Sequence, residues 1–459
     1  MGNNIERKKD LLNPSWIYRL FRMYVKFFHD KFFYRHMYTV NKENVPENGT
    51  PLLIASNHQN CMNDPLCIVS SFKKRQVFFI ARADVFKNPI ASRFLHFLGL
   101  YPAFRLEYEG SETLDNNFAT FEAAGKILME GHTVGIYPEA GHQDKRWLGE
   151  FSLGYLKMAF EAAEKDNFEK EVFIMPVCNH YSKYEGIQHD ELVKYGTPIS
   201  LAPYYELFKT KPRTAQRTVN EKVREQISTL MLNIEDLENY EALDYLRNTY
   251  GVKFAIQKGF NHQILPEKLS ADKLFIQKMA EFKECNSEAM NNLCKKALEL
   301  KDKTLKSNIR DWNFEKPFSI SRILLQSLLF ILLFPLFICT IFPNWVIFFA
   351  PKLITRKLND KMFVNSVNFG LSILVTIPLL YSVSFALCWH LSGSLWVALA
   401  YLMALPYLGL FSYYYHRTFV KWLSEIRFKL ILKKENTQKL IELRSSLFSL
   451  LDKELNKKQ

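Results

Sequence analysis

The first half of the chain alternates short apolar runs with segments in which apolar residues recur at helical spacing. Runs rich in β-branched or aromatic residues predict strands near 52–55, 77–81, 133–137 and 172–177. Helical spacing predicts helices over 65–72, 89–98, 114–130 and 152–164. Gly99 and Gly131 follow two of these segments and are expected to end the helices. This alternation is typical of an α/β layer, in which helices cover a sheet.

The chain before this layer begins with a polar lead and then becomes aromatic and basic. From Pro14 to about Tyr38, aromatic and aliphatic residues recur at helical spacing beside arginine and lysine. We expect residues 1–40 to form an amphipathic helix region that lies in the plane of a membrane interface. An ordinary helix packed on the neighbouring domain is the alternative.

After the α/β layer, residues 206–316 are charged and are predicted to be helical. Two amphipathic faces are formed by Val219, Val223, Ile227 and Leu230 and by Met290, Leu293, Ala297 and Leu298. Ser287 is the expected cap of the second helix. No pattern in this segment indicates a chemical function, so we interpret it as a scaffold. A lid and a docking surface for a carrier protein are the alternatives.

Residues 317–416 are predicted to be an α-helical membrane region, because long stretches of them lack charge. No Asp, Glu, Lys or Arg occurs between Arg322 and Lys352 or between Lys361 and Arg417. The second of these stretches divides into two predicted spans, near 367–387 and 395–415.

The first uncharged stretch is longer than one span of about 20 residues and shorter than two. It contains Pro335 and Pro343, and proline can break a helix. The linker after this stretch and the tail 417–459 are both rich in lysine and arginine, which predicts that both lie in the cytoplasm. We therefore expect the first stretch to be a re-entrant hairpin that turns near Pro343, and the two later spans to form a second hairpin.

Composition agrees with a membrane-associated protein of more than one domain. The 459 residues are 48% hydrophobic, and a net charge of +13 suits a surface that lies against anionic headgroups. Nucleic-acid binding is the competing interpretation of this charge, but no helix-turn-helix, zinc-finger or RNA-binding signature occurs, so we expect no nucleic-acid partner. The seven cysteines include no Cys-x-x-Cys pair, which predicts neither a zinc motif nor a disulfide framework. We expect reduced thiols.

The stretch from Ala55 to Pro65 carries the candidate chemistry. His58 follows an apolar strand, and Asp64 with Pro65 indicates the start of a helix that has Asp64 as its N-cap. Catalytic groups are often held on such connections by a rigid scaffold. A neutral imidazole held by a carboxylate can take the proton of an attacking hydroxyl group. The alternative is a loop histidine beside a helix cap.

Three further blocks follow in order. They read GLYPAFR from Gly99 to Arg105, YPEAG from Tyr137 to Gly141, and MPV from Met175 to Val177. Together with His58 and Asp64, they resemble the four blocks of the glycerolipid (phospholipid and glycerol) acyltransferase family over roughly residues 35–205.

Two blocks depart from the family's usual pattern. The family commonly has four residues between His and Asp, which would place Asn63 at the acidic position. Some eukaryotic glycerol-3-phosphate acyltransferases resemble this chain here, so Asp64 is the candidate partner of His58. The family also commonly has Gly-Thr-Arg after Pro-Glu, where this chain has Ala140, Gly141 and His142.

The resemblance implies that His58 is a general base with Asp64 as its partner and that no covalent acyl-enzyme forms, so Cys61 is interpreted as a small apolar filler. The candidate substrate-binding residues are Asn57, Arg105, Glu139, Gly141, His142, Lys145 and Arg146. The Arg105 guanidinium suits the phosphate of an acceptor, and a surface ion pair with a nearby glutamate is its alternative. Glu139 is expected to accept hydrogen bonds from acceptor hydroxyls or to order the amides that hold an oxyanion. No metal is expected.

The resemblance also implies a fold and an activity. We expect a mixed sheet covered by helices as the catalytic domain at 41–205, followed by the helical segment and the membrane region. The expected reaction is acyl transfer from acyl-CoA or acyl carrier protein to lysophosphatidate, a membrane lipid, giving phosphatidate without a cofactor. Glycerol 3-phosphate is the alternative acceptor. We expect the active site on the cytoplasmic face of the membrane.

Two alternatives come from other classes of protein. One is an inactive relative used as a membrane scaffold, which the displaced Asp64 and the altered third block favour. The other is a transporter or channel, but the apolar half of the chain carries no acidic residue, lysine or arginine within its spans to line a pathway.

Overall fold

The computed structural model describes residues 15–73, 75–103, 114–139, 141, 145–315, 319–347, 353, 356, 363–432 and 434–455. The chain divides into two compact units. The first unit comprises residues 1–233 and 354–369, and the second comprises residues 234–353 and 370–459.

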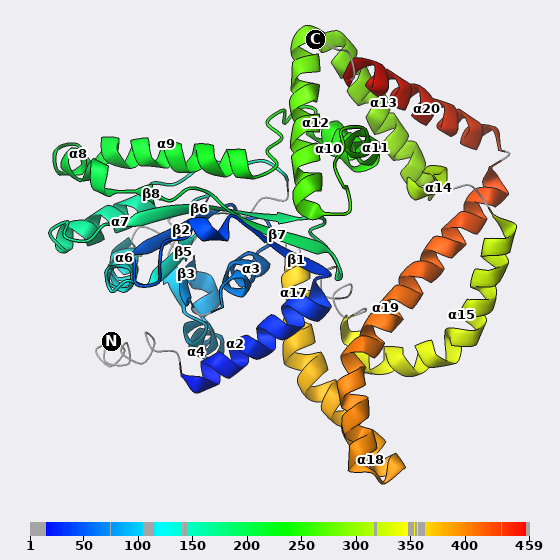
Figure 1. The fold of residues 1–459 in the computed structure, drawn as a ribbon, viewed down its shortest axis with the longest axis horizontal. Helices are drawn as coiled ribbons and strands as arrows, with labels where there is room; N and C mark the ends of the chain where they lie inside the picture. The colour runs from blue at the N-terminus through cyan, green and yellow to red at the C-terminus, as the bar shows by residue number, and fades with distance from the viewer. Residues whose placement is uncertain are drawn as a thin grey trace. The chain divides into compact units, whose positions relative to one another are not determined.

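An eight-stranded sheet forms the centre of the first unit (Figure 1). Its strand order is β1-β7-β6-β2-β5-β3-β4, and β8 pairs with β6 outside this path. The strands are β1 (His36–Val40), β2 (Leu52–Ser56), β3 (Val77–Arg82), β4 (Leu100–Ala103), β5 (Thr133–Ile136), β6 (Phe173–Tyr181), β7 (Asp190–Tyr195) and β8 (Ile199–Ser200). The run from β6 to β4 is parallel, whereas β7 is antiparallel to β6, so the predicted mixed sheet is confirmed.

Strand β2 lies between β5 and β6. Ile54 is opposite Gly135 of β5 on one side and Met175 of β6 on the other. Every residue of β2 is buried, which explains why the strand has a continuous apolar sequence rather than an alternating one. The four predicted strands are present, but β1, β4, β7 and β8 were not predicted. Strand β7 has Asp, Glu and Lys among its six residues, so it lacks the apolar run that identified the others.

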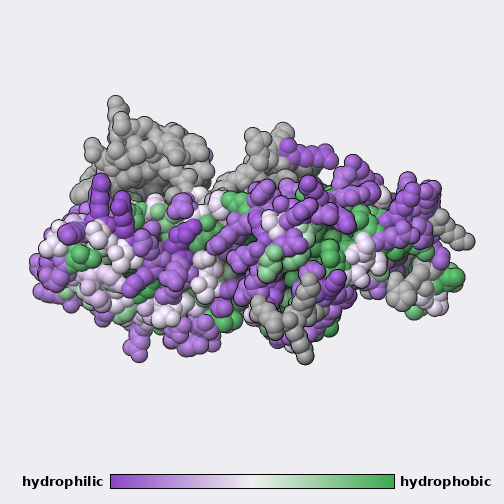
Figure 2. Space-filling model, turned by 90° about the horizontal axis from the view of Figure 1, so that it is seen from above, coloured by the Kyte–Doolittle hydropathy of each residue, from purple (hydrophilic) through white to green (hydrophobic). Residues whose placement is uncertain are grey.

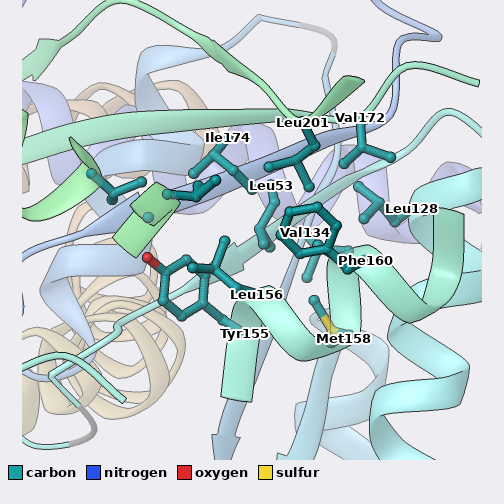
Figure 3. Packing of buried hydrophobic residues seen from close by; sticks show 14 of the residues in the cluster. Leu53, Leu128, Val134, Tyr155, Leu156, Met158, Phe160, Val172, Ile174 and Leu201 are labelled. Carbon is teal, nitrogen blue, oxygen red and sulfur yellow. The ribbon is translucent and has the colours of Figure 1, made fainter. Parts of the chain in front are cut away.

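Helices α6 (Leu114–Met129), α7 (Gly154–Lys165) and α9 (Pro212–Leu230) cover one face of the sheet. Their apolar side chains pack with Leu53, Val134 and Ile174 in a single core (Figure 3). Residues Ile174 and Cys178 of β6 face this core, so Tyr181, an odd-numbered residue of the same strand, points to the other side of the sheet. Helix α3 (Asn63–Ser71) lies on that opposite face, because its Cys67 contacts Tyr181. The remaining elements of this unit are α2 (Trp16–Phe28), η2 (His29–Phe33), η3 (Lys42–Asn44), η4 (Ala83–Phe86), α4 (Pro89–Phe97), η6 (Ala202–Tyr204) and α8 (Tyr205–Thr210).

Two predicted helix stops are confirmed. Gly99 and Gly131 follow α4 and α6 with φ of 82° and 83°, in the left-handed region that glycine enters without strain. At Gly131, a Cβ atom would also lie 2.3 Å from the carbonyl oxygen of Gly49, so only glycine fits this turn.

Helix α9 belongs with the sheet although its sequence is highly charged. Its predicted apolar face of Val219, Val223, Ile227 and Leu230 is buried in the core of the first unit. The unit therefore extends to Asn233, past the domain boundary expected at residue 205.

The second unit contains a bundle of polar helices. These are α10 (Tyr240–Thr249), α11 (Gly251–Gln257), α12 (Leu265–Cys285), α13 (Ser287–Lys306) and α20 (Glu435–Leu455). The expected cap at Ser287 is wrong: Asn286 caps α13, and its Oδ1 accepts a hydrogen bond of 2.9 Å from the amide of Ala289. Leu298 is exposed rather than part of the apolar face, which Leu300 completes.

Hydrophilic residues cover much of the face of the molecule drawn in Figure 2.

Three helical stretches among the described residues are long and apolar enough to cross a membrane. They are Ile320–Ile347, Val364–Ser392 and Leu395–Ile431. They contain α15 (Ile320–Ile341), η7 (Phe342–Asn344), most of α17 (Phe363–Leu371), η8 (Ser372–Tyr381), α18 (Ser382–Ser392) and α19 (Leu395–Ile431). Helix α15 continues through Pro335, so a break at that proline is wrong, and the first irregularity is the η7 turn that contains Pro343.

Buried polar side chains link the apolar helices of the second unit. The hydroxyl groups of Thr340 in α15 and Ser412 in α19 are 2.7 Å apart. The Asn344 amide donates to the carbonyl of Thr340 at 3.0 Å and accepts from the Tyr381 hydroxyl at 2.9 Å. Such hydrogen bonds, made where water is excluded, favour helix association in a membrane.

The positive flanks of these helices predict a membrane topology that can be measured. Single cysteines would be introduced at Thr355, Gly393 or Ser424 in a cysteine-free protein. Intact cells would then be treated from outside with a membrane-impermeant thiol reagent. We expect label only at Gly393, because the linker and the tail are basic and should remain in the cytoplasm. Label at Thr355 would contradict the re-entrant hairpin and show that the first stretch crosses the bilayer.

Candidate functional site

The candidate site lies at the carboxyl ends of neighbouring strands. Strands β2 and β5 are parallel and paired, so the loop after β2 and the loop after β5 emerge at the same edge of the sheet. The first loop leads to α3 and carries His58, and the second leads to α7 and carries Glu139. Open α/β sheets bind ligands at this edge.

His58 and Asp64 are in direct contact. His58 Nδ1 is 2.7 Å from Asp64 Oδ2, which shows that a separation of six positions brings the two side chains together. The Asp64 side chain is fully buried, whereas 19% of the His58 side chain is exposed. The pair therefore has one member inside the protein and one member at its surface.

The local backbone explains how Asp64 reaches His58. The expected N-cap role of Asp64 is wrong, because α3 begins at Asn63 and Asp64 lies in its first turn. From there, Asp64 Oδ2 accepts hydrogen bonds from the amides of Gln59 and Asn60, each at 2.8 Å. These bonds fold the loop back over the carboxylate, and the positive end of the helix dipole favours its charge.

The Asp64 contact also determines which ring nitrogen of His58 is available as a base. A neutral imidazole that donates from Nδ1 to the carboxylate has its lone pair on Nε2. The ring stacks on Tyr137, with centroids 4.0 Å apart and planes inclined by 17°. Tyr137 in turn stacks on Phe79 at 6.0 Å. Gly135 allows this arrangement, because a Cβ atom there would lie 2.3 Å from the Phe79 ring.

Glu139 joins the two loops through its carboxylate. Its Oε1 accepts a hydrogen bond from the His58 amide at 3.0 Å, and its Oε2 accepts one from the Gly149 amide at 2.9 Å. Burial raises the pKa of Glu139, and these two bonds oppose that rise. Glu139 thus orders the backbone amides of His58 and Gly149, and its expected role toward an oxyanion or an acceptor hydroxyl remains a prediction.

Asn57 is tied to strand β6 on the other side of β2. Its side-chain amide donates to the Asn179 carbonyl at 3.0 Å, and its Oδ1 accepts from the Asn179 amide at 2.8 Å. The Asn57 side chain is buried, so these bonds fix the start of the loop that carries His58. A substrate-binding role for Asn57 remains a prediction.

Arg146 and Lys145 follow the third block. Arg146 is buried, donates to the Tyr181 carbonyl at 3.0 Å and lies over the Tyr184 ring at 4.9 Å. The Lys145 carbonyl accepts a hydrogen bond of 3.1 Å from Gln59, so this segment also lies against the His58 loop. Gly141, four residues before Lys145 in the sequence, is half-buried. Two predicted site residues, Arg105 and His142, lie outside the described residues.

Tyr181 is a site residue that the sequence did not identify. Its hydroxyl donates to Asp64 Oδ1 at 2.7 Å, so the carboxylate has partners on both oxygens. Burial, and then the negative charge of Asp64, raise the pKa of this hydroxyl, which keeps it protonated as a donor. The predicted strand ended at residue 177, four positions before Tyr181, because residues 178–181 read Cys-Asn-His-Tyr and carry neither an apolar run nor an alternating pattern that would extend it.

The arrangement can take a proton from a bound hydroxyl group. It provides an imidazole at the surface, a buried carboxylate that supports its positive form, and two loops held together by Glu139. Cys61 is buried and has φ of 42°, in agreement with a filler of the turn.

A family model described as Acyltransferase matches residues 36–180. Over 144 residues the chain is 26% identical to glycerol-3-phosphate O-acyltransferase 2 of Saccharomyces cerevisiae, covering 31% of this chain and 19% of that protein. Over 130 residues it is 28% identical to a "Probable 1-acyl-sn-glycerol-3-phosphate acyltransferase" of Mycoplasma pneumoniae, covering 27% of this chain and 44% of that protein. The chain thus spans less than half the length of each of these relatives.

Among solved structures, the chain is similar to the 1-acyl-sn-glycerophosphate (LPA) acyltransferase PlsC from Thermotoga maritima. The identity is 17%, the match covers 47% of this chain and 79% of that chain, and the TM-score is 0.34. The match to the family model contains the His58–Asp64 pair and the loops that meet it. The chain therefore carries an acyltransferase family domain over residues 36–180.

Proposed function

We propose that this chain is a membrane-bound acyltransferase that transfers a fatty acyl group from a thioester of coenzyme A or acyl carrier protein to lysophosphatidate, giving phosphatidate. The observation that carries the proposal is the 2.7 Å contact between His58 Nδ1 and the buried Asp64 carboxylate within the acyltransferase domain. The same contact argues against an inactive scaffold, since the displaced acidic residue still reaches the histidine.

The proposed reaction proceeds without a covalent enzyme intermediate. The acceptor hydroxyl loses its proton to His58 Nε2 while its oxygen attacks the thioester carbonyl, and a tetrahedral intermediate forms. This intermediate collapses, the carbon–sulfur bond breaks, and the departing thiolate receives the proton from the imidazolium. Asp64 stabilises the imidazolium between these two steps, and amide and hydroxyl donors hold its carboxylate in place.

A phosphate on the acceptor would give a role to the basic residues of the second and third sequence blocks. Arg105 and His142 come from the second and third blocks, and Lys145 follows them closely. We propose that Arg105 binds the phosphate through its fork of donors, with Lys145 adding positive charge. Arg146 is proposed to act indirectly, since its guanidinium already contacts Tyr181 and Tyr184.

The N-terminal helix supports an acceptor that is drawn from a membrane. One side of α2 packs on α4 through the rings of Tyr18 and Phe21. The other side exposes large apolar residues to solvent, namely Trp16, Ile17, Leu20, Met23 and Phe27. A soluble protein seldom exposes such a stripe, and burial of the stripe in the headgroup region would bring the domain to its lipid acceptor. We propose that this occurs at the cytoplasmic leaflet, where the basic linker and tail are expected to lie.

Glycerol 3-phosphate is a second candidate acceptor. The relative from Saccharomyces cerevisiae that matches the domain is named for that substrate. Both acceptors present a hydroxyl and a phosphate, so the same site chemistry serves either one. Assays of purified protein with each acceptor and each thioester would distinguish them.

Replacing His58 tests the general base. In His58→Ala, turnover should fall by roughly a hundredfold to ten-thousandfold, because a positioned base typically contributes that much. His132→Ala is a matched control, since His132 precedes β5 at the opposite end of the strand from the site. Initial rates with purified proteins, together with thermal unfolding to check the fold, measure both variants. Near wild-type turnover in His58→Ala would overturn the assignment.

Replacing Arg105 tests the phosphate site. Arg105→Ala should raise the KM for the acceptor far more than the KM for the acyl thioester, because only the acceptor contacts the proposed guanidinium. Arg93→Ala, which removes an exposed arginine of α4, is the control and should change neither constant. An equal loss for both substrates in Arg105→Ala would indicate a structural ion pair instead.

A further inference from the structure

Three side chains that commonly bind metal ions meet inside the first unit, away from the surface. They are His29 in η2, Cys67 in α3 and Glu191 in β7. All three residues are completely buried, and their ligand atoms lie within 4.8 Å of one another. The three positions are far apart in the sequence, so no spacing motif could reveal them.

Atoms of this cluster are buried without hydrogen bonds. His29 Nε2 and the two oxygens of Glu191 have no nitrogen or oxygen hydrogen-bond partner, and the Cys67 thiol is the polar group beside Glu191. His29 Nε2 lies 3.7 Å from Glu191 Oε2, which is too long for a hydrogen bond. Polar groups left unsatisfied in the interior are costly, so a ligand that satisfies all three would stabilise this arrangement.

The other nitrogen of His29 shows how the ring is oriented. His29 Nδ1 is 2.8 Å from Asp30 Oδ1, and a neutral ring that donates from Nδ1 directs the lone pair of Nε2 toward Glu191. Two acceptors would then face each other across the cluster. A histidine held at one nitrogen by a carboxylate, with the lone pair of the other directed inward, is the usual arrangement of a metal ligand.

We propose that His29 Nε2, Cys67 Sγ and Glu191 bind a zinc ion. In a tetrahedral zinc site, bonds of about 2.0–2.2 Å place a nitrogen and an oxygen ligand roughly 3.3–3.6 Å apart, so the 3.7 Å between His29 Nε2 and Glu191 Oε2 requires only a small approach of the two side chains. A thiolate with an imidazole favours zinc over magnesium or calcium. The fourth position is left for a water molecule.

Charge balance supports a divalent cation at this place. The Cys67 thiolate and the Glu191 carboxylate together carry two negative charges, and a zinc ion with a neutral His29 cancels them. A buried site of zero net charge avoids the large cost of placing an uncompensated ion in the interior. Aromatic rings close the surroundings, with Tyr34 4.9 Å and Phe369 5.4 Å from the His29 ring between centroids.

The ion would join three segments that are far apart in the sequence. It would fix η2, which follows the N-terminal helix, to α3 and to β7. Cys67 Sγ also lies 3.0 Å from the Tyr181 hydroxyl, so in the metal-bound form the Tyr181 proton would lie between the Cys67 thiolate and Asp64 Oδ1. The proposed zinc site is thus a structural clamp beneath the helix whose first turn carries Asp64.

Metal content of the full-length protein tests this proposal. Protein purified in detergent without a polyhistidine tag or chelators should contain zinc in a stoichiometric amount by elemental analysis. Cys67→Ser and Glu191→Gln should each lower zinc affinity by more than about tenfold, since even changes around the ligands of a metal site cost that much. Cys178→Ser is the matched control, because Cys178 is an equally buried cysteine of β6 outside the cluster and forms no disulfide.

Cobalt provides a readout on the wild-type protein, which does not depend on whether the ligand variants fold. Wild-type protein stripped of metal and loaded with cobalt should gain a thiolate-to-cobalt charge-transfer absorption in the near ultraviolet, and Cys178→Ser should retain it. Absence of both zinc and this absorption in the wild type would overturn the proposal and indicate a metal-free pair of His29 and Glu191. Neither measurement depends on acyltransfer, so this outcome is distinct from a failure of the proposed function.

Discussion

The buried carboxylate of Asp64 connects the parts of the site to one another. Its two oxygens accept hydrogen bonds from the His58 ring, the amides of Gln59 and Asn60, and the Tyr181 hydroxyl. Hydrogen bonds to a charged group contribute about 1.5–3 kcal/mol each, and an unpaired buried carboxylate is costly. The loop conformation and the orientation of the imidazole therefore both depend on the hydrogen bonds to this one group.

The sheet makes this carboxylate useful by bringing a second loop to it. Because β2 and β5 are parallel neighbours, Glu139 reaches the His58 amide from the adjacent connection, and Tyr137 supplies the surface on which the His58 ring stacks. The apolar core beneath, formed by β2, β5, β6 and the covering helices, holds these strands in register. A rigid layer thus positions a partly exposed base, as expected for a site at the carboxyl edge of such a sheet.

The sequence predicted the parts of the fold that have strong local signals. Continuous apolar runs identified β2, β3, β5 and much of β6, and helical periodicity identified α3, α4, α6 and α7 within one or two residues at their ends. Strand β7 was missed because its charged residues are buried by tertiary partners, as in the contact of Asp190 with Arg35. His58 and Asp64 were found from their order along the chain, whereas Tyr181 and the cluster of His29, Cys67 and Glu191 arise only when distant segments pack together.

A double-mutant cycle on His58 and Asp64 tests most directly whether the two residues act as one unit. The turnover of His58→Ala, Asp64→Asn and the double variant would be compared with that of the wild type under saturating acceptor and thioester. If Asp64 acts through the imidazole, the double variant should be about as slow as His58→Ala alone, because the carboxylate has no base left to support. Losses that multiply in the double variant would contradict the account and show that Asp64 contributes independently of His58.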